Sequence, residues 1–303
     1  MKKNVFLIIV VFFAITMTAC EQLSKKDFDN EQARQALEYA EEQYERLYQS
    51  LETNEMYPRT ITEDGSIKMV KARDWTSGFF PGSMWYLYEI TGHEPWKERA
   101  EAFTNNLEGL KNFTGTHDLG FMMYNSFGHG LRVAGIIEYE DILIEGARAL
   151  ASRYRPIVGA SRSWDHNTDK WQYPVIIDNM MNLEYLFWAA MVTDSAYFKD
   201  ISVSHAITTM NNHFREDNSS YHVVNYDTLT GEVLSKNTHQ GYSDASAWAR
   251  GQAWGLYGYT MTYRETKNEA FLEQAVKIAD FILGHPNLPD DMVPYWDFDA
   301  PGI

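Results

Sequence analysis

Cysteine, basic residues and common catalytic motifs are all scarce in this sequence. With Cys20 as its one cysteine, the chain cannot form an internal disulfide. Histidines show no HxH or HExxH spacing, so no metal site is predicted, and no serine has the GxSxG setting of a serine hydrolase. The 26 Lys and Arg against 42 Asp and Glu give a net charge of −16, which argues against nucleic acid as a partner. Any acidic ligand must therefore be met by a local basic group.

Long apolar runs are also missing, except near the N-terminus. Two lysines precede an apolar run over residues 5–15, which is too short for a typical membrane span. The run is closed by Met17-Thr18-Ala19-Cys20, which resembles the lipobox of a bacterial lipoprotein; plain secretion with a chance cysteine is the alternative. We predict a signal peptide over 1–20 with lipidation of Cys20, a tether over 21–28 and one large domain over 29–303. The expected location is the periplasm or outer membrane, with the lipid anchor as the only membrane contact.

Amphipathic helical patterns dominate the rest of the chain, and strand signals are sparse. Three predicted helices end in similar turns, in which a Thr and several polar or small residues precede an aromatic that opens the next helix: TGHEPW at 91–96, TDSAYF at 193–198 and TKNEAF at 266–271. This αα-hairpin repeat predicts an all-α fold, an (α/α)6 toroid of apolar inner and amphipathic outer helices. An open α-solenoid is the alternative. We expect about nine helices, fewer than a closed ring of six hairpins contains, so that either the ring is open or the domain is shortened at its C-terminus.

The same periodicities set the expected elements. Inner helices are predicted in the second half of 73–92, at 126–137, from 178 onward and at 244–266. Their partners are predicted at 96–110, 142–154, 196–214 and 270–283, and a separate helix at 29–51. Loops are expected over 118–125 and around Pro58, Asp64 and Gly65. A short strand hairpin is expected from 221–226 and 232–234.

Asp178 stands at the most distinctive junction, where the apolar segment PVII ends and a helical pattern begins. An ionised carboxylate is costly to bury unless it is paired, and desolvation raises its pKa until it can donate a proton near neutral pH. Asp118 occupies the equivalent place in the preceding repeat, so two carboxylates are candidates for acid–base chemistry. The alternative is that each Asp simply caps its helix.

Other residues that could bind a ligand lie at the loop-to-helix junctions. A toroid brings these junctions together at one of its ends. The residues are Trp75, His117, Trp164, His222, Gln240, Trp248, Arg250 and Trp254. The two histidines are better explained as hydrogen-bonding groups than as metal ligands. Arg250 and Trp254 share one helical face, and a guanidinium between Trp248 and Trp254 suits the carboxylate of a sugar. A structural ion pair between Arg250 and nearby Asp244 is an equally good interpretation.

Five segments together resemble one enzyme family in their order and spacing. They are RDWTSGFFPG, HDLGFMMYNSFG, IIDNMMNLE, the loop from Tyr221-His222 to Asp227, and THQGYSDASAWARGQAWGLYGY. From about residue 30 to 303 the chain resembles glycoside hydrolase family 88, the unsaturated glucuronyl hydrolases. Family 105, the unsaturated rhamnogalacturonyl hydrolases, shares the fold, but the His117-Asp118 loop is more similar to family 88.

The resemblance implies a cofactor-free glycosidase. It would remove a 4,5-unsaturated glucuronic acid from the non-reducing end of lyase-generated oligosaccharides by hydrating a vinyl ether. Asp178 matches the general acid/base of the family, and Asp118 matches its second essential carboxylate. The sugar would be held by His117, His222, Gln240, Arg250 and the tryptophans. The alternatives are a family 105-like enzyme acting on pectin fragments and a non-catalytic surface glycan-binding lipoprotein, which has no need for two buried carboxylates.

Overall fold

A computed structural model describes residues 31–302, so Cys20, the predicted signal peptide and the tether lie outside the described residues. The chain divides into two compact units, Met1–Glu52 and Thr53–Ile303. The first unit contains helix α2 (Glu31–Gln49), in agreement with the helix expected at 29–51. It begins with an acidic residue and has Arg46 in its last turn, and both charges are favourable with the helix dipole.

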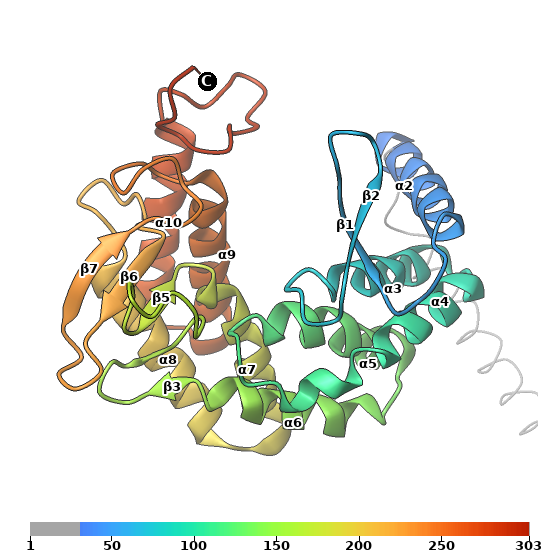
Figure 1. Cartoon of the computed structure of the whole chain (residues 1–303), viewed down its shortest axis with the longest axis horizontal. Coiled ribbons are helices and arrows are strands. Elements are labelled where there is room, and N and C mark those ends of the chain that lie inside the picture. The colour runs from blue at the N-terminus through green and yellow to red at the C-terminus, as the bar shows by residue number, and fades with distance from the viewer. Residues whose placement is uncertain (1–30, 303) are drawn as a thin grey trace, which may run out of the picture. The chain divides into compact units, whose positions relative to one another are not determined.

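The second unit consists mainly of helical hairpins (Figure 1). Within the described residues the hairpins are α3 (Phe79–Thr91) with α4 (Glu94–Asn105), π-helix η2 (Gly120–Gly128) and α5 (His129–Ala134) with α6 (Tyr139–Ala151), α7 (Asn179–Thr193) with α8 (Ala196–Asn212), and α9 (Ala249–Thr266) with α10 (Glu269–Gly284). A short 3₁₀ helix, η1 (Glu108–Asn112), follows α4. This order confirms the predicted αα-hairpin repeat.

The first helices of the hairpins pack against one another in the order α3, η2, α7 and α9. Two glycines allow neighbouring inner helices to approach each other closely. A Cβ on Gly82 of α3 would lie 2.6 Å from the carbonyl oxygen of Asn125, and one on Gly258 of α9 would lie 2.4 Å from the Cβ of Met180. The second helix of each hairpin packs against its own first helix. These contacts confirm the predicted division into inner and outer helices.

The recurring Thr of the three similar turns has a common role. In each turn its hydroxyl donates a hydrogen bond to the carbonyl four residues earlier, which closes the last turn of the inner helix; the three residues are Thr91, Thr193 and Thr266. The residue after each Thr has a positive φ and ends the helix in the left-handed conformation; these are Gly92, Asp194 and Lys267. The repeat in sequence is therefore a repeated helix C-terminus.

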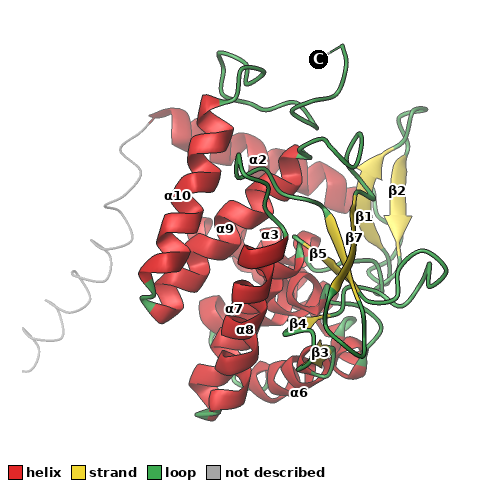
Figure 2. Cartoon of the chain, turned by 90° about the vertical axis from the view of Figure 1, so that its left-hand side faces the viewer, coloured by secondary structure: helices red, strands yellow, loops and turns green. Residues whose placement is uncertain are grey.

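Three small sheets accompany the helices (Figure 2). The predicted strand hairpin is confirmed as β6 (Val223–Tyr226) and β7 (Val233–Asn237), and β5 (Pro174–Ile176) extends it as a third, antiparallel strand. The prediction of a loop around Pro58 is wrong, because β1 (Tyr57–Ile61) and β2 (Ile67–Val70) form a hairpin. The turn of this hairpin contains Gly65 at a φ of 83°. The third sheet pairs β3 (Tyr154–Arg155) with β4 (Ala160–Ser161).

Several predicted boundaries are wrong, among them the end of the helix expected at 96–110, because α4 ends at Asn105 and η1 follows as a separate 3₁₀ helix. The expected loop over 118–125 is mostly helix, because η2 begins at Gly120, where the backbone N–H of Phe121 donates to Asn182 of α7. The helix expected at 142–154 is α6, which lies three residues earlier. The helix expected from 244 begins only at Ala249, because Trp248 is extended and forms a β-bridge with Asp297. No helix within residues 31–302 combines the length and apolar character needed to span a bilayer.

Candidate functional site

Asp178 lies where β5 leads into α7. It occupies the N-cap position, but its side chain makes no capping hydrogen bond, and its backbone is already helical. The residue is 8% exposed, and its Oδ2 has no hydrogen-bond partner within the described residues. The neighbouring Ile177 N–H donates to the carbonyl of His222 and so fixes the junction against β6. Capping therefore does not explain why a carboxyl group is buried here.

Burial is the main reason why the pKa of Asp178 is raised from 3.8 to about 7, and the negative charge of Asp118 raises it further. The positive charge of Arg250 acts in the opposite direction. The indole N–H of Trp254 also lowers the pKa, although it forms no hydrogen bond of normal geometry. A carboxyl group with a pKa near neutrality can both give and accept a proton at working pH, which is the property that a general acid/base needs.

Asp118 lies at the entrance to η2, and its carboxylate is held by the Thr116 hydroxyl. The Thr116 hydroxyl donates to Oδ2 over 2.6 Å, and Nε2 of His117 lies 3.2 Å from Oδ1. This segment pairs with a second loop through a β-bridge between Thr116 and Trp164 and a bond from the His117 N–H to Ser163. Like Asp178, Asp118 precedes an inner helix, and its negative charge acts on the Asp178 carboxyl. The two predicted carboxylates are thus brought into one site.

The tautomers of the two predicted histidines follow from their partners. Nδ1 of His117 lies 2.9 Å from the Ser163 carbonyl, which can only accept, so this nitrogen carries a proton. Nδ1 of His222 accepts from the backbone N–H groups of His239 and Gln240, each over 3.0 Å, so its proton is on Nε2, 3.6 Å from Asp178 Oδ2. Burial lowers the pKa of His222 to about 3, which keeps the ring neutral.

Arg250 lies in the first turn of α9 and forms no ion pair with Asp244 in the described chain. Asp244 instead accepts from Asn237 and from the Thr238 N–H, whereas Arg250 donates to the Gln240 amide over 2.5 Å. The Arg250 guanidinium lies 4.6 Å from the ring centre of Trp248. The interpretation as a structural Arg–Asp pair is therefore wrong, and the guanidinium remains available to an acidic ligand.

The second aromatic ring beside the Arg250 guanidinium belongs to Trp75, whose ring centre lies 5.7 Å away, and not to Trp254 as expected. Trp254 instead contacts Phe121 of η2, which in turn contacts Trp75. The spacing of four on α9 correctly places Arg250 and Trp254 on one face, but it cannot show that the loop before α3 contributes the nearer ring. Phe121 was not among the predicted residues, although it lies three positions after Asp118.

Trp164 joins the same cluster through His239, which sequence reasoning missed. The His239 ring centre lies 5.5 Å from that of Trp164 and 6.4 Å from that of His222. His222 also contacts Trp248, with ring centres 4.7 Å apart. The signal for His239 was its place beside Gln240 in the THQGY segment. All ten residues predicted for catalysis or substrate binding thus belong to one connected set of contacts and charges.

Unsatisfied buried polar atoms are concentrated in this set. Five belong to predicted site residues: His117 Nε2, Trp164 Nε1, Asp178 Oδ2, His222 Nε2 and Trp254 Nε1. Buried polar atoms in folded proteins are normally hydrogen-bonded, so a group of this kind is typical of a site that receives a polar ligand. Within residues 31–302, no three His, Cys, Asp or Glu side chains come together as a metal-binding group. The expectation of no metal stays a prediction.

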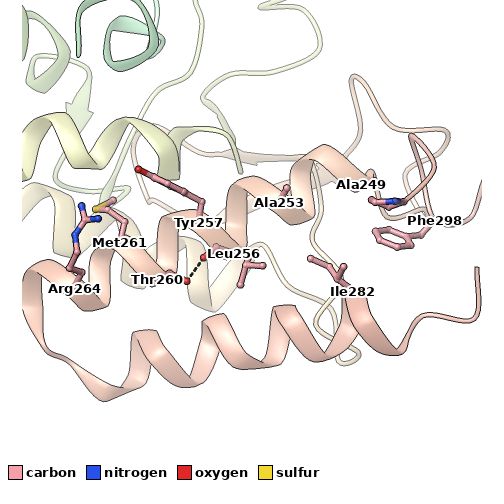
Figure 3. Close-up of a pocket in the computed structure, with 10 residues that line it drawn as sticks. Ala249, Ala253, Leu256, Tyr257, Thr260, Met261, Arg264, Ile282 and Phe298 are labelled. Atoms are coloured by element: carbon pink, nitrogen blue, oxygen red, sulfur yellow. Dashed lines mark hydrogen bonds between the residues drawn. The ribbon is translucent and has the colours of Figure 1, made fainter. Parts of the chain in front are cut away.

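A separate pocket of about 510 Å³ runs along α9 (Figure 3). It is lined mostly by apolar side chains, among them Leu256, Met261, Ile282 and Phe298, and Arg264 lies at one end. None of its lining residues belongs to the predicted set, and it contains no acid–base pair. We therefore place the candidate site at the inner-helix entrances and not in this pocket.

Comparisons with known proteins give consistent neighbours, although no protein-family model matches the chain. An unsaturated glucuronyl hydrolase of Formosa agariphila is 42% identical over 306 residues, which cover the whole chain and 76% of that protein. An unsaturated chondroitin disaccharide hydrolase of Streptococcus pyogenes is 34% identical over 91% of this chain and 69% of that protein. The structure of an unsaturated glucuronyl hydrolase specific for heparin is 50% identical, with a TM-score of 0.83, over 86% of this chain and 69% of that chain. These neighbours assign the observed hairpins to the predicted (α/α)6 toroid.

Proposed function

Because this chain belongs to the unsaturated glucuronyl hydrolases of glycoside hydrolase family 88, we propose that Asp178 is the general acid/base of its reaction. The chain is a glycosidase that acts on oligosaccharides ending in an unsaturated uronic acid. The observation that carries the proposal is the buried, uncapped Asp178 carboxyl, whose pKa is raised to about 7.

The proposed reaction adds water across the C4=C5 double bond of the terminal sugar. The protonated Asp178 carboxyl gives its proton to C4, and the electron pair of the double bond forms the new C4–H bond. The positive charge at C5, shared with the ring oxygen, is captured by a water that passes a proton to the Asp178 carboxylate. The C5–O bond of the resulting hemiketal then breaks, leaving a C5 ketone and a C1 hemiacetal that releases the remaining chain. The acid is regenerated, so one residue serves both steps.

The other site residues hold the substrate in this proposal. Asp118 accepts hydrogen bonds from sugar hydroxyls, and its negative charge keeps the pKa of Asp178 high. Arg250 binds the uronate carboxylate, because a planar guanidinium makes a two-point contact with a planar carboxylate. Gln240 orients Arg250, and the Trp75 and Trp248 rings beside it contact the sugar ring. Nε2 of His222, which carries the proton of the ring, lies 3.6 Å from the reacting carboxyl.

The function is tested by following the loss of the double-bond absorbance with unsaturated chondroitin, heparin and rhamnogalacturonan disaccharides. We expect turnover of a disaccharide with an unsaturated glucuronic acid, and its loss in Asp178→Asn. Turnover of the rhamnogalacturonan product alone would assign a family 105-like specificity. If the wild type binds these sugars but consumes none of them, the chain is a glycan-binding protein and the catalytic proposal fails.

We also propose that Cys20 carries a lipid anchor and that the protein is an exported bacterial lipoprotein of the periplasm or outer membrane. Support comes from the charged start, the apolar run and the Met17-Thr18-Ala19-Cys20 ending. Cys20→Ser should leave the membrane fraction as a soluble or uncleaved species. Unchanged membrane association, together with an unmodified Cys20 by mass spectrometry, would refute the anchor.

A further inference from the structure

A basic pocket lies apart from the candidate site, where the end of α6 meets β3 and β4. It has a volume of about 370 Å³, within the range of small-molecule sites, and shares no lining residue with the candidate site. Its charged lining residues are Arg153, Arg155, Arg162 and Asp165. Three guanidinium groups against one carboxylate leave a local excess of positive charge in a chain with a net charge of −16. Such a local reversal of sign is the condition for binding an anion.

Two of these residues, Arg153 and Asp165, hold each other in place. Arg153 is buried and donates to both oxygens of Asp165, over 3.0 and 3.1 Å. Its other bonds go to the backbone carbonyls of Arg162 and Thr114. With both its oxygens engaged by Arg153, the Asp165 carboxylate is held in place, and its single negative charge cannot neutralise all three guanidinium groups.

The other two arginines keep unused donors. Arg162 Nη1 lies 3.2 Å from Asp165, but its buried Nε has no hydrogen-bond partner within the described residues. Arg155 is exposed on β3 and forms no ion pair in the described part of the chain. A buried guanidinium N–H without an acceptor is unfavourable unless a ligand supplies one.

We propose that this pocket binds a tetrahedral oxyanion of the sulfate or phosphate class, with Arg155 and Arg162 as its donors. Arg155 lies on β3 and Arg162 directly follows β4, so the two paired strands of one hairpin bring both guanidinium groups to the pocket. The site does not depend on the proposed hydrolase reaction. Its ligand is either a sulfate ester on a sugar or a free inorganic anion.

A neighbouring hollow favours the ester on a sugar. Ser152, which lines the basic pocket, also lines an adjoining hollow of about 560 Å³. That hollow carries the ring of Tyr197, which is 53% exposed. An exposed aromatic face with a hydroxyl tip can contact both the apolar and the polar parts of a sugar ring. A sulfated saccharide would place its sulfate among the arginines and a sugar ring beside Tyr197.

Titration calorimetry with inorganic sulfate, with chloride balancing the ionic strength, tests the anion site. We expect one saturable site in the wild type and about tenfold weaker binding in Arg155→Gln, the effect of one lost charge-assisted contact. Lys277→Gln, which removes an exposed charge on α10 outside the pocket, should bind as the wild type does. Arg250→Gln should also retain the site, which separates it from the guanidinium of the candidate site. Absence of saturable binding, or equal weakening in Lys277→Gln, overturns the proposal.

A second titration identifies the source of the anion. It uses a saturated sulfated disaccharide, which lacks the double bond consumed at the candidate site, and its desulfated counterpart. Tighter binding of the sulfated sugar than of inorganic sulfate, weakened by Tyr197→Ala, supports a sugar-borne ligand. If the sulfated disaccharide binds no more tightly than inorganic sulfate, and Tyr197→Ala does not change its binding, the result supports a free inorganic anion at the same arginines. Equal binding of the desulfated sugar, with no effect of Arg155→Gln, would overturn the site.

Discussion

Nε2 of His222 lies 3.6 Å from Oδ2 of Asp178, and it carries the proton of the ring because Nδ1 accepts two backbone N–H groups. Burial keeps the pKa of His222 at about 3, so Asp178 faces a neutral donor and not a cation. A cation at this place would lower the pKa of the carboxyl. The neutral histidine therefore leaves burial and Asp118 to hold the pKa of Asp178 near 7.

Asp178→Asn should fold and lose on the order of 10²–10⁴-fold in kcat, the usual contribution of a general acid–base group. Asparagine has nearly the same shape but cannot cycle a proton. Steady-state assays of double-bond loss measure the effect. Asp194→Asn at the other end of α7 is the matched control, because asparagine tolerates its left-handed conformation, and it should keep wild-type activity. A rate above about a tenth of wild type in Asp178→Asn would contradict the assignment.

The raised pKa of Asp178 also predicts how stability changes with pH. The folded carboxyl holds its proton up to about pH 7, whereas the unfolded one loses it near 3.8. The folded state therefore loses stability relative to the unfolded state as pH rises through this window, by on the order of a few kcal/mol. Asparagine does not ionise, so the Tm of Asp178→Asn relative to wild type should rise between pH 4 and pH 8. A difference that does not change with pH would show that the carboxyl titrates normally.

The effects of two charges on Asp178 should have opposite signs. Asp118→Asn removes a negative neighbour and should lower the pKa of Asp178, whereas Arg250→Gln removes a positive neighbour and should raise it. A ¹³C NMR titration of the Asp178 carboxyl measures both shifts even in inactive variants. In variants with residual activity, the fall of kcat/KM at high pH should move in the same direction. Shifts of the same sign in the two variants would rule out this electrostatic arrangement.

The fold could be predicted where it depends on local pattern. The hairpin repeat followed from helical periodicity and from turns whose Thr hydroxyl acts within its own helix. The pairing of β5 could not be found in this way, because its partner β6 lies far along the chain. The start of α9 was missed for a similar reason, since Trp248 is held extended by its bridge to Asp297.

The same distinction, between local pattern and contacts from distant segments, explains which residues of the site could be predicted. Asp178 could be recognised because its unusual setting, an apolar segment before a helix, is local in sequence. The partner of Arg250 could not, since Trp75 reaches it from a distant loop. His239 and Phe121 likewise gain their positions only when separate hairpins meet. Sequence pattern thus located the candidate carboxyl group more readily than the residues that surround it.

Arg250→Lys should weaken binding of the acidic substrate by roughly tenfold or more, because lysine cannot keep the planar two-point contact and a hydrogen bond to a charged group contributes about 1.5–3 kcal/mol. The loss should appear mainly in KM if the contact is equally strong in the ground and transition states. Thermal melting should change little, since Arg250 is exposed and its one side-chain hydrogen bond in the described chain is to the exposed Gln240. Steady-state kinetics and melting on the same preparation measure both quantities.

Arg264→Lys is the control for this prediction because Arg264 lies on the same helix but has a structural role. Its guanidinium binds Glu184 of α7 and the adjacent Glu265, and it is outside the candidate site. As a half-exposed surface pair, it should alter the melting temperature only slightly and leave KM unchanged. The two variants thus separate a ligand-binding arginine from a structural one. An unchanged KM with a lowered Tm in Arg250→Lys would remove Arg250 from the site, and the attraction for an acidic sugar would then have to come from another basic group.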